Sequence, residues 1–221
     1  MAHAIEPGAG EWTAADLVER FGPIPLCRIR LHPPPGSATE RDVVEIHDRE
    51  DRLCELVDGV LVEKTVGTYE SYLAVLLAQL LGDYVRRHDL GILLGADGML
   101  RLVPELVRIP DLSFISWQRL PGREVPDQPI ADLVPDLAIE VISRSNTRKE
   151  MERKLAEYFS VGVRQVWYVD HSPRRQVRVY ASPTECLTLG EQEVIEGGDV
   201  LPGFRLELAQ LFAKPGQTGT P

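Results

Sequence analysis

The chain is poor in cysteine and lacks long apolar runs, and each shortage removes a class of protein. Its three cysteines, Cys27, Cys54 and Cys186, are widely spaced and form no CxxC pair. This usage is typical of reduced thiols in a cytosolic protein rather than of a disulfide framework. No apolar run approaches the roughly 18 residues that a membrane helix needs. Residues 1–6 also lack the basic and then apolar segments of a secretory signal. We therefore expect a cytoplasmic protein with no membrane partner.

Sequence motifs of several enzyme classes are missing as well. The chain contains no GxGxxG, GxxxxGK[ST], HExxH or GxSxG motif. Its five histidines are scattered, so a histidine-ligated metal site is not expected. The net charge of −10 argues against avid binding of nucleic acid by the monomer, because a polyanion requires a basic surface. A nuclease remains compatible with that charge, because carboxylates that hold a metal contribute to the excess of acidic residues. A local strip of basic residues can also coexist with a negative net charge.

The composition that is present predicts one main domain with appendages. Of the 221 residues, 43% are hydrophobic and 26% are charged, as in ordinary globular proteins. Residues 1–50 are expected to form an N-terminal extension, with a helix at 12–21 capped by Thr13 and a proline-rich linker at 33–37. This extension can pack on the core, swap to a partner or cover a site. Residues 51–212 are the expected domain, and residues 213–221 a flexible tail.

The order of expected elements defines the fold class. Residues 53–64 predict a β-hairpin around Asp58-Gly59, because this pair readily adopts the positive φ of a tight turn. Apolar spacing predicts helices over 69–88 and 148–160, the second capped by Asn146 or Thr147, whereas residues 40–52 fit a helix or a strand. Strands are expected at 91–95, 99–103, 110–117, 136–142, 165–170 and 176–180. We therefore predict an α/β (α+β) protein with a mixed β-sheet flanked by helices and one right-handed βαβ unit over 136–170.

Two of these apolar strands carry carboxylates. Asp111 and Glu140 are near enough in sequence to lie on neighbouring strands and meet. Glu140 stands between Ile139 and Val141, so its carboxylate must be paired with a cation, bound to a metal or neutral. Asp111 follows a proline, so an alternative is that it merely begins its strand and takes no part in a site. For Asp136, which also follows a proline, this structural role is the preferred interpretation.

Two carboxylates and a lysine suit the hydrolysis of a phosphodiester. Mg²⁺ prefers hard oxygen ligands and keeps several waters, so Asp111 and Glu140 are the expected metal ligands. Lys154, on the following helix, is the expected cation beside the water or the phosphate. A buried ion pair for Glu140 and a solvated Lys154 are the alternatives. Glu70 is a candidate third ligand, although an acid at a helix start is the simpler interpretation.

Two further acids flank the expected hairpin. Glu55 and Glu63 are interpreted as outward-facing, solvated side chains rather than as members of the site.

The order of these residues resembles a known family. The Pro-Asp strand, the run from Asp136 to Ser143, then Lys154 with Tyr158, and the run 162–170 are similar to the Uma-type restriction endonuclease family of the PD-(D/E)XK nuclease superfamily. The resemblance covers roughly residues 50–180. It departs from the motif in one respect, because Ile142 stands two residues after Glu140, where the motif has its lysine. Members of the family move this lysine to the next helix.

The resemblance implies a restriction-endonuclease-like fold, a DNA-cleaving site that depends on Mg²⁺ or Mn²⁺, and a homodimer. In this sequence the motif aspartate is Asp111, the second acid Glu140 and the lysine Lys154. Relatives commonly have a histidine at the start of the long helix, where this chain has Tyr69-Glu70-Ser71. The alternative function is a catalytically inactive protein that keeps the fold as a regulatory or assembly module. The acidic charge favours this alternative, and the retained acids and lysine oppose it.

Overall fold

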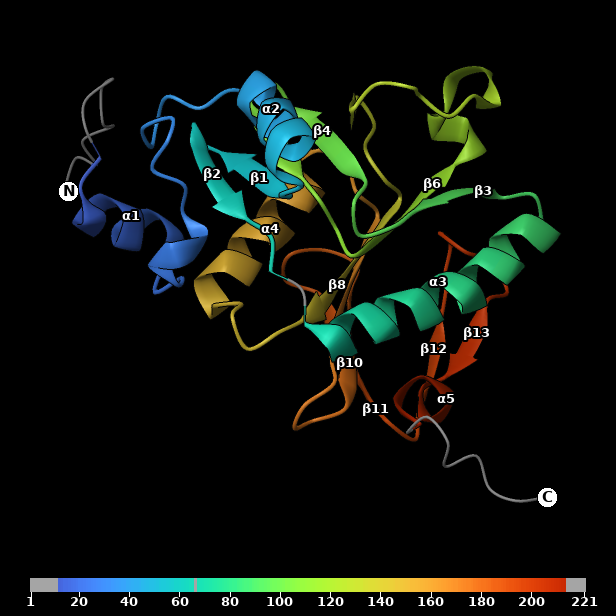
Figure 1. The fold of residues 1–221 in the computed structure, drawn as a ribbon. Helices are drawn as coiled ribbons and strands as arrows, with labels where there is room; N and C mark the ends of the chain where they lie inside the picture. Colours follow the sequence, from blue (N-terminus) through green and yellow to red (C-terminus); the bar gives the residue numbers. More distant parts are fainter. Residues whose placement is uncertain (1–11, 66, 214–221) are drawn as a thin grey trace.

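The computed structural model describes residues 12–65 and 67–213 (Figure 1). Within these ranges the α-helices are α1 (Ala14–Phe21), α2 (Glu40–Glu50), α3 (Thr68–Arg87), α4 (Arg148–Ser160) and α5 (Leu208–Phe212). Short 3₁₀ turns are η1 (Leu26–Arg28), η2 (Trp117–Arg119) and η3 (Pro121–Arg123). No helix in the described ranges is long and apolar enough to cross a membrane.

The strands form two larger sheets and one small one. The five-stranded sheet has the order β2-β1-β5-β4-β7 and consists of β1 (Cys54–Val57), β2 (Val60–Glu63), β4 (Met99–Val103), β5 (Leu106–Arg108) and β7 (Ile130–Ala131). The six-stranded sheet has the order β11-β10-β9-β8-β6-β3 and consists of β3 (Gly91–Leu94), β6 (Leu112–Ser116), β8 (Leu137–Ile142), β9 (Gln165–Asp170), β10 (Gln176–Tyr180) and β11 (Cys186–Gly190). The third sheet pairs β12 (Val194–Glu196) with β13 (Arg205–Glu207).

This architecture confirms the predicted class, a mixed α/β fold with flanking helices, and divides the expected sheet in two. The chain leaves one sheet for the other between β3 and β4. Leu94 pairs with Ser113 in the six-stranded sheet, whereas Met99 pairs with Ile130 in the five-stranded sheet. The turn between them is closed by a hydrogen bond from Gly98 N–H to the Gly95 carbonyl of 3.0 Å. Alternating strand patterns alone do not reveal such a change of sheet.

The six-stranded sheet has a helix on each face. Leu137, Ile139 and Val141 pack in the core that contains the buried side of α3. Ala138 belongs instead to the core formed with α4. Because side chains alternate along a strand, Glu140 points to the same face as Ala138, toward α4. The strand therefore places one carboxylate among the side chains of that helix.

The βαβ unit that the sequence predicts is present. Strands β8 and β9 are parallel, with Glu140 opposite Tyr168, and α4 connects them. Helix α4 begins with a capping box, in which the Thr147 hydroxyl accepts a hydrogen bond from Glu150 N–H at 3.1 Å. This cap fixes where the helix starts and therefore which of its residues face the sheet.

Replacing Thr147 with alanine removes this cap, and we expect the free energy of unfolding to fall by about 1 kcal/mol. Urea denaturation followed by circular dichroism measures it, since a change in midpoint at constant slope reports stability alone. An unchanged midpoint would show that other contacts of α4 define its first turn.

The N-terminal residues that the structure describes pack on the rest of the protein. Residues 40–50, which the sequence left undecided, form α2, and Val43 and Ile46 are buried against Cys54 and Leu56. The expected linker at 33–37 forms a turn held to the β1–β2 hairpin, since Gly36 N–H donates to the Gly59 carbonyl at 2.8 Å. Of the three arrangements left open for residues 1–50, packing on the core therefore holds for residues 12–50. The tail at 214–221 lies outside the described residues.

Candidate functional site

Asp111 and Glu140 lie side by side at one end of the β6–β8 pair. These strands are antiparallel, with Leu112 opposite Ile139, so continuing the register by one residue puts Asp111 opposite Glu140. The Val141 N–H donates to Asp111 Oδ2 at 2.7 Å and holds that carboxylate against β8. Both acids are buried, with 9% and 5% of their surface exposed. The sheet thus brings together the two carboxylates that the sequence selected.

Helix α4 supplies two donors to Glu140. Lys154 Nζ lies 2.9 Å from Glu140 Oε1, and the Tyr158 hydroxyl donates to the same oxygen at 2.6 Å. Lys154 is 4% exposed, so the alternative of a solvated lysine is wrong and that of a buried ion pair for Glu140 is present. Burial raises the pKa of the Glu140 carboxyl, an effect larger than the opposing one of Lys154.

Glu55 completes the surroundings of Lys154, and the interpretation of Glu55 as an outward-facing acid is wrong. It is 2% exposed, and its Oε1 lies 2.9 Å from Lys154 Nζ and accepts from the Ile109 N–H at 3.1 Å. Its Oε2 accepts from Arg108 Nη1 at 2.7 Å. Burial alone would raise the pKa of Glu55, but Lys154 and Arg108 outweigh it and lower that pKa to about 2. Glu63 instead pairs with Arg30 near the surface.

Lys64 is a second buried lysine at the site, and the sequence reasoning missed it. Its Nζ lies 2.9 Å from Asp111 Oδ1 and donates to the carbonyls of Ala96 and Ile109 at 3.0 and 2.8 Å. Its position directly after the second strand of the hairpin is visible in the sequence, but that position does not indicate its partner. Each of the two carboxylates is therefore matched with one lysine.

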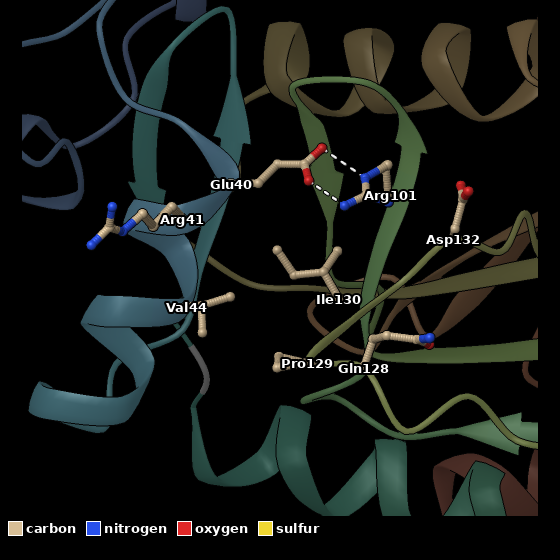
Figure 2. Close-up of a pocket in the computed structure, with 8 residues that line it drawn as sticks. All are labelled: Glu40, Arg41, Val44, Arg101, Gln128, Pro129, Ile130 and Asp132. Carbon is tan, nitrogen blue, oxygen red and sulfur yellow. Dashed lines mark hydrogen bonds and ion pairs between the residues drawn. The ribbon is translucent and has the colours of Figure 1, made fainter.

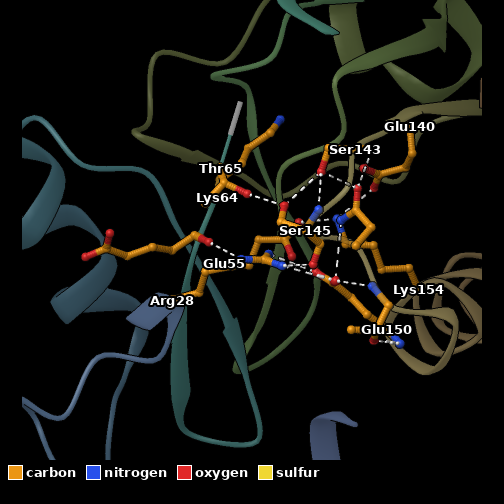
Figure 3. A network of polar contacts seen from close by, with 12 residues as sticks. Arg28, Glu55, Lys64, Thr65, Glu140, Ser143, Ser145, Glu150 and Lys154 are labelled. Atoms are coloured by element: carbon orange, nitrogen blue, oxygen red, sulfur yellow. Dashed lines mark hydrogen bonds and ion pairs between the residues drawn. The ribbon is translucent and has the colours of Figure 1, made fainter. Parts of the chain in front are cut away.

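Further ion pairs connect this centre to the N-terminal segment (Figure 3). Arg28 is buried and donates two hydrogen bonds to Glu150 of α4, from Nη2 to Oε1 at 2.8 Å and from Nη1 to Oε2 at 3.1 Å. Arg108 also contacts Glu157 of α4, with its Nε 2.7 Å from Glu157 Oε2. Helix α4, and with it Lys154, is therefore held by both β5 and the N-terminal segment.

The two other acids considered in the sequence lie outside this centre. Asp136 only begins β8, because its Oδ2 accepts from Ser116 N–H at 2.8 Å and its Oδ1 pairs with Arg119 at 3.0 Å. Glu70 lies at the start of α3 and its Oε1 is 3.2 Å from His171 Nε2. Within residues 12–65 and 67–213, no three His, Cys, Asp or Glu side chains form a group that could hold a metal. Glu70 thus does not join Asp111 and Glu140 as a third ligand in this structure.

The donor chemistry of the remaining pair fits a magnesium ion. Mg²⁺ is commonly bound by one or two carboxylates and completes its octahedron with waters and substrate phosphate. Asp111 and Glu140 provide two adjacent hard oxygen donors, and both carboxylates are buried. Two carboxylates side by side are therefore a reasonable site for a divalent cation that would share them with the lysines.

A separate cavity of about 470 Å³ lies between α2 and the β4–β7 edge (Figure 2). Its lining includes Arg101 and Glu40, joined by a hydrogen bond from Arg101 Nε to Glu40 Oε1 of 2.8 Å. It has no residue in common with the carboxylates and lysines described above. Charged side chains from β1, β5, β8 and α4, together with Lys64 and Asp111, converge instead at the carboxylate centre.

The fold and this centre define a restriction-endonuclease-like α/β protein. The structure is similar to the crystal structure of "a putative nuclease belonging to DUF820" from Anabaena variabilis ATCC 29413. The match has a TM-score of 0.63 at 16% sequence identity and covers 73% of this chain and 90% of the other, so it shows a shared fold. The chain belongs to the Uma2 family, described as "Putative restriction endonuclease", whose profile matches residues 41–209. A search of curated proteins finds no match.

Proposed function

We propose that this protein is a magnesium-dependent endonuclease that hydrolyses phosphodiester bonds of DNA and that accepts Mn²⁺ in place of Mg²⁺. The observation that supports the proposal most directly is the adjacency of Asp111 and Glu140 on paired strands, with Lys154 2.9 Å from Glu140. Membership in the Uma2 family supports the same reaction class.

In this proposal each residue has a separate task. Asp111 and Glu140 would hold the metal, which would supply charge neutralisation at the phosphate and activation of the attacking water. Lys154 is the cation that faces the water or the phosphate, and its position is fixed by Glu140 and Glu55. Burial alone would lower the pKa of Lys154, but the two acids outweigh it and raise that pKa, so the side chain is a cation at neutral pH.

One observation favours the alternative of a catalytically inactive module. Both carboxylates already have a lysine partner at 2.9 Å, so the centre is neutralised without a metal. Homodimer formation, a cytoplasmic location and the division into a domain at 51–212 with appendages stay predictions.

The proposal predicts that the purified chain converts supercoiled plasmid to nicked and linear forms in Mg²⁺ or Mn²⁺ and that EDTA stops the conversion. The metal dependence follows because a bound cation would neutralise phosphate charge and help to activate the attacking water. Agarose gel electrophoresis over time measures the conversion. Asp111→Ala purified in parallel controls for contaminating nuclease.

Two results would contradict the enzyme assignment. The first is no cleavage in either metal together with no heat of Mn²⁺ binding by calorimetry. The second is equal cleavage by the Asp111→Ala preparation, which would assign the activity to a contaminant.

A further inference from the structure

A pocket of about 410 Å³ opens at the carboxyl ends of the parallel strands β8 and β9. Ser143, Arg144 and Ser145 line it from the segment after β8, and His171 from the segment after β9. Thr65, which follows Lys64, lines it from the hairpin side. Ser143 is three residues beyond Glu140, so at about 3.3 Å per residue the pocket lies roughly 10 Å along the strand from that carboxylate.

The two segments beside this pocket are basic in an acidic protein. Residues 143–149 (Ser-Arg-Ser-Asn-Thr-Arg-Lys) contain three basic residues and no acidic one, and residues 171–175 (His-Ser-Pro-Arg-Arg) contain two arginines and no acidic residue. The chain as a whole has a net charge of −10. We call these two segments the basic rim. Arg144 and Arg174 are exposed, and neither makes an ion pair with any residue in the described ranges.

The first of these segments is already held in one conformation. Asn146 Oδ1 accepts from the Ser143 N–H at 2.9 Å and from the Ser143 hydroxyl at 3.0 Å. The Ser145 hydroxyl lies 2.7 Å from the Thr65 hydroxyl and 2.8 Å from that of Ser143 (Figure 3). Hydroxyl and arginine side chains are groups that contact nucleic-acid phosphates, and the prior ordering of these hydroxyls lowers the entropy cost of binding.

The interior of the pocket is unsuited to a small free anion. Glu70 lies inside it, held by His171 at 3.2 Å, and Asp170 lines the same wall and accepts from the Ser172 N–H at 3.3 Å. These two carboxylates repel an anion that enters the pocket, whereas Arg144, which is exposed on the pocket lining, attracts one that crosses its edge. Arg174 follows the lining residue Ser172 by two positions. The charges therefore favour an extended polyanion lying over the rim.

We propose that the basic rim binds the phosphate backbone of the DNA strand, about three nucleotides from the carboxylate pair. The figure of three nucleotides is the 10 Å offset divided by the roughly 3.4 Å per phosphate along a strand. The inference rests on the proposed function and deepens it, because it names the surface by which an acidic protein holds a polyanion.

The double variant Arg144→Ala/Arg174→Ala tests the rim by binding rather than by cleavage. The probes are fluorescein-labelled single-stranded and duplex DNA in EDTA, where no metal-dependent hydrolysis occurs, and the readout is anisotropy over a range of salt. We expect the dissociation constant to rise about tenfold and the slope of log affinity against log salt to fall by about 2, one unit for each lost phosphate contact.

Arg86→Ala/Arg87→Ala is the matched control. It removes the same charge from the far end of α3, roughly 30 Å from the start of that helix. An equal loss of DNA affinity in both double variants would overturn the proposed role of the basic rim, because it would show an effect of net charge alone. An unchanged slope in the rim variant, or no binding of either DNA by the unaltered protein, would overturn it as well.

The binding and cleavage assays can contradict the basic rim and the endonuclease proposal separately. Loss of binding only in the rim variant, with an unaltered protein that cleaves nothing, would support the rim and contradict the endonuclease. Cleavage by the unaltered protein, with the rim variant binding and cleaving equally well, would support the endonuclease and overturn the rim.

Discussion

Glu140→Gln is expected to lower the rate of plasmid cleavage by about 1000-fold or more. The amide keeps the shape of the side chain and an oxygen for the hydrogen bonds from Lys154 and Tyr158. It removes the negative charge that a divalent cation requires. Loss of a metal's charge stabilisation in the transition state is worth several kcal/mol, and about 4 kcal/mol corresponds to this factor. Initial rates of nicking at saturating Mg²⁺ measure the effect, and calorimetry measures the loss of Mn²⁺ binding.

The same variant is expected to fold with little loss of stability, and this separates catalysis from folding. Burial already disfavours the charged form of Glu140 and raises its pKa. Lys154 keeps a second carboxylate partner in Glu55, 2.9 Å away. A glutamate of similar size outside the centre, Glu63, provides the control, and Glu63→Gln is expected to leave cleavage unchanged. Cleavage by Glu140→Gln at the unaltered rate would remove Glu140 from the reaction and with it the proposed metal site.

The sequence predicted the elements that carry the centre because their patterns are local. Asp58-Gly59 sets the hairpin, with φ of 52° and 68°, and Thr147 caps α4 as expected from its side chain. The short separation of the two apolar strands that carry Asp111 and Glu140 allowed them to be neighbours, and β6 does pair with β8. These local signals place Asp111, Glu140 and Lys154 close together.

The sequence did not predict which polar side chains are buried, because this depends on contacts between distant segments. Glu55 alternates with apolar neighbours, like a residue that faces solvent, but the face it occupies is covered by α4 and Arg108. Lys64 reaches Asp111 across 47 residues of sequence (111 − 64 = 47), and nothing in its local pattern marks that partner. Period-two alternation predicts which residues share a face, but it cannot predict whether that face is covered.

Glu55→Ala is expected to be the most destabilising substitution in the protein's centre, with a loss of about 3 to 5 kcal/mol in the free energy of unfolding. Removing one partner of a buried ion pair leaves the other charges without compensation. Here the side chains left behind are Lys154 and Arg108, both buried, and the Ile109 N–H loses its acceptor. Urea denaturation at pH 7 measures the loss. Glu63→Ala removes a glutamate from the same hairpin, where it pairs with Arg30 near the surface, and is expected to cost at most about 1 kcal/mol.

The pH dependence of stability gives the prediction a second, independent measurement. The pKa of Glu55 in the folded protein is about 2, below its ordinary value of 4.5, because Lys154 and Arg108 outweigh the effect of burial. A depressed folded pKa contributes stability that is complete above pH 4.5 and is lost as the pH falls from 4.5 toward 2. The unaltered protein should therefore lose stability more steeply than Glu55→Ala over this interval, so that the difference between them narrows. A difference that stays constant down to pH 2 would show that the lost packing of the side chain, rather than its charge, causes the destabilisation.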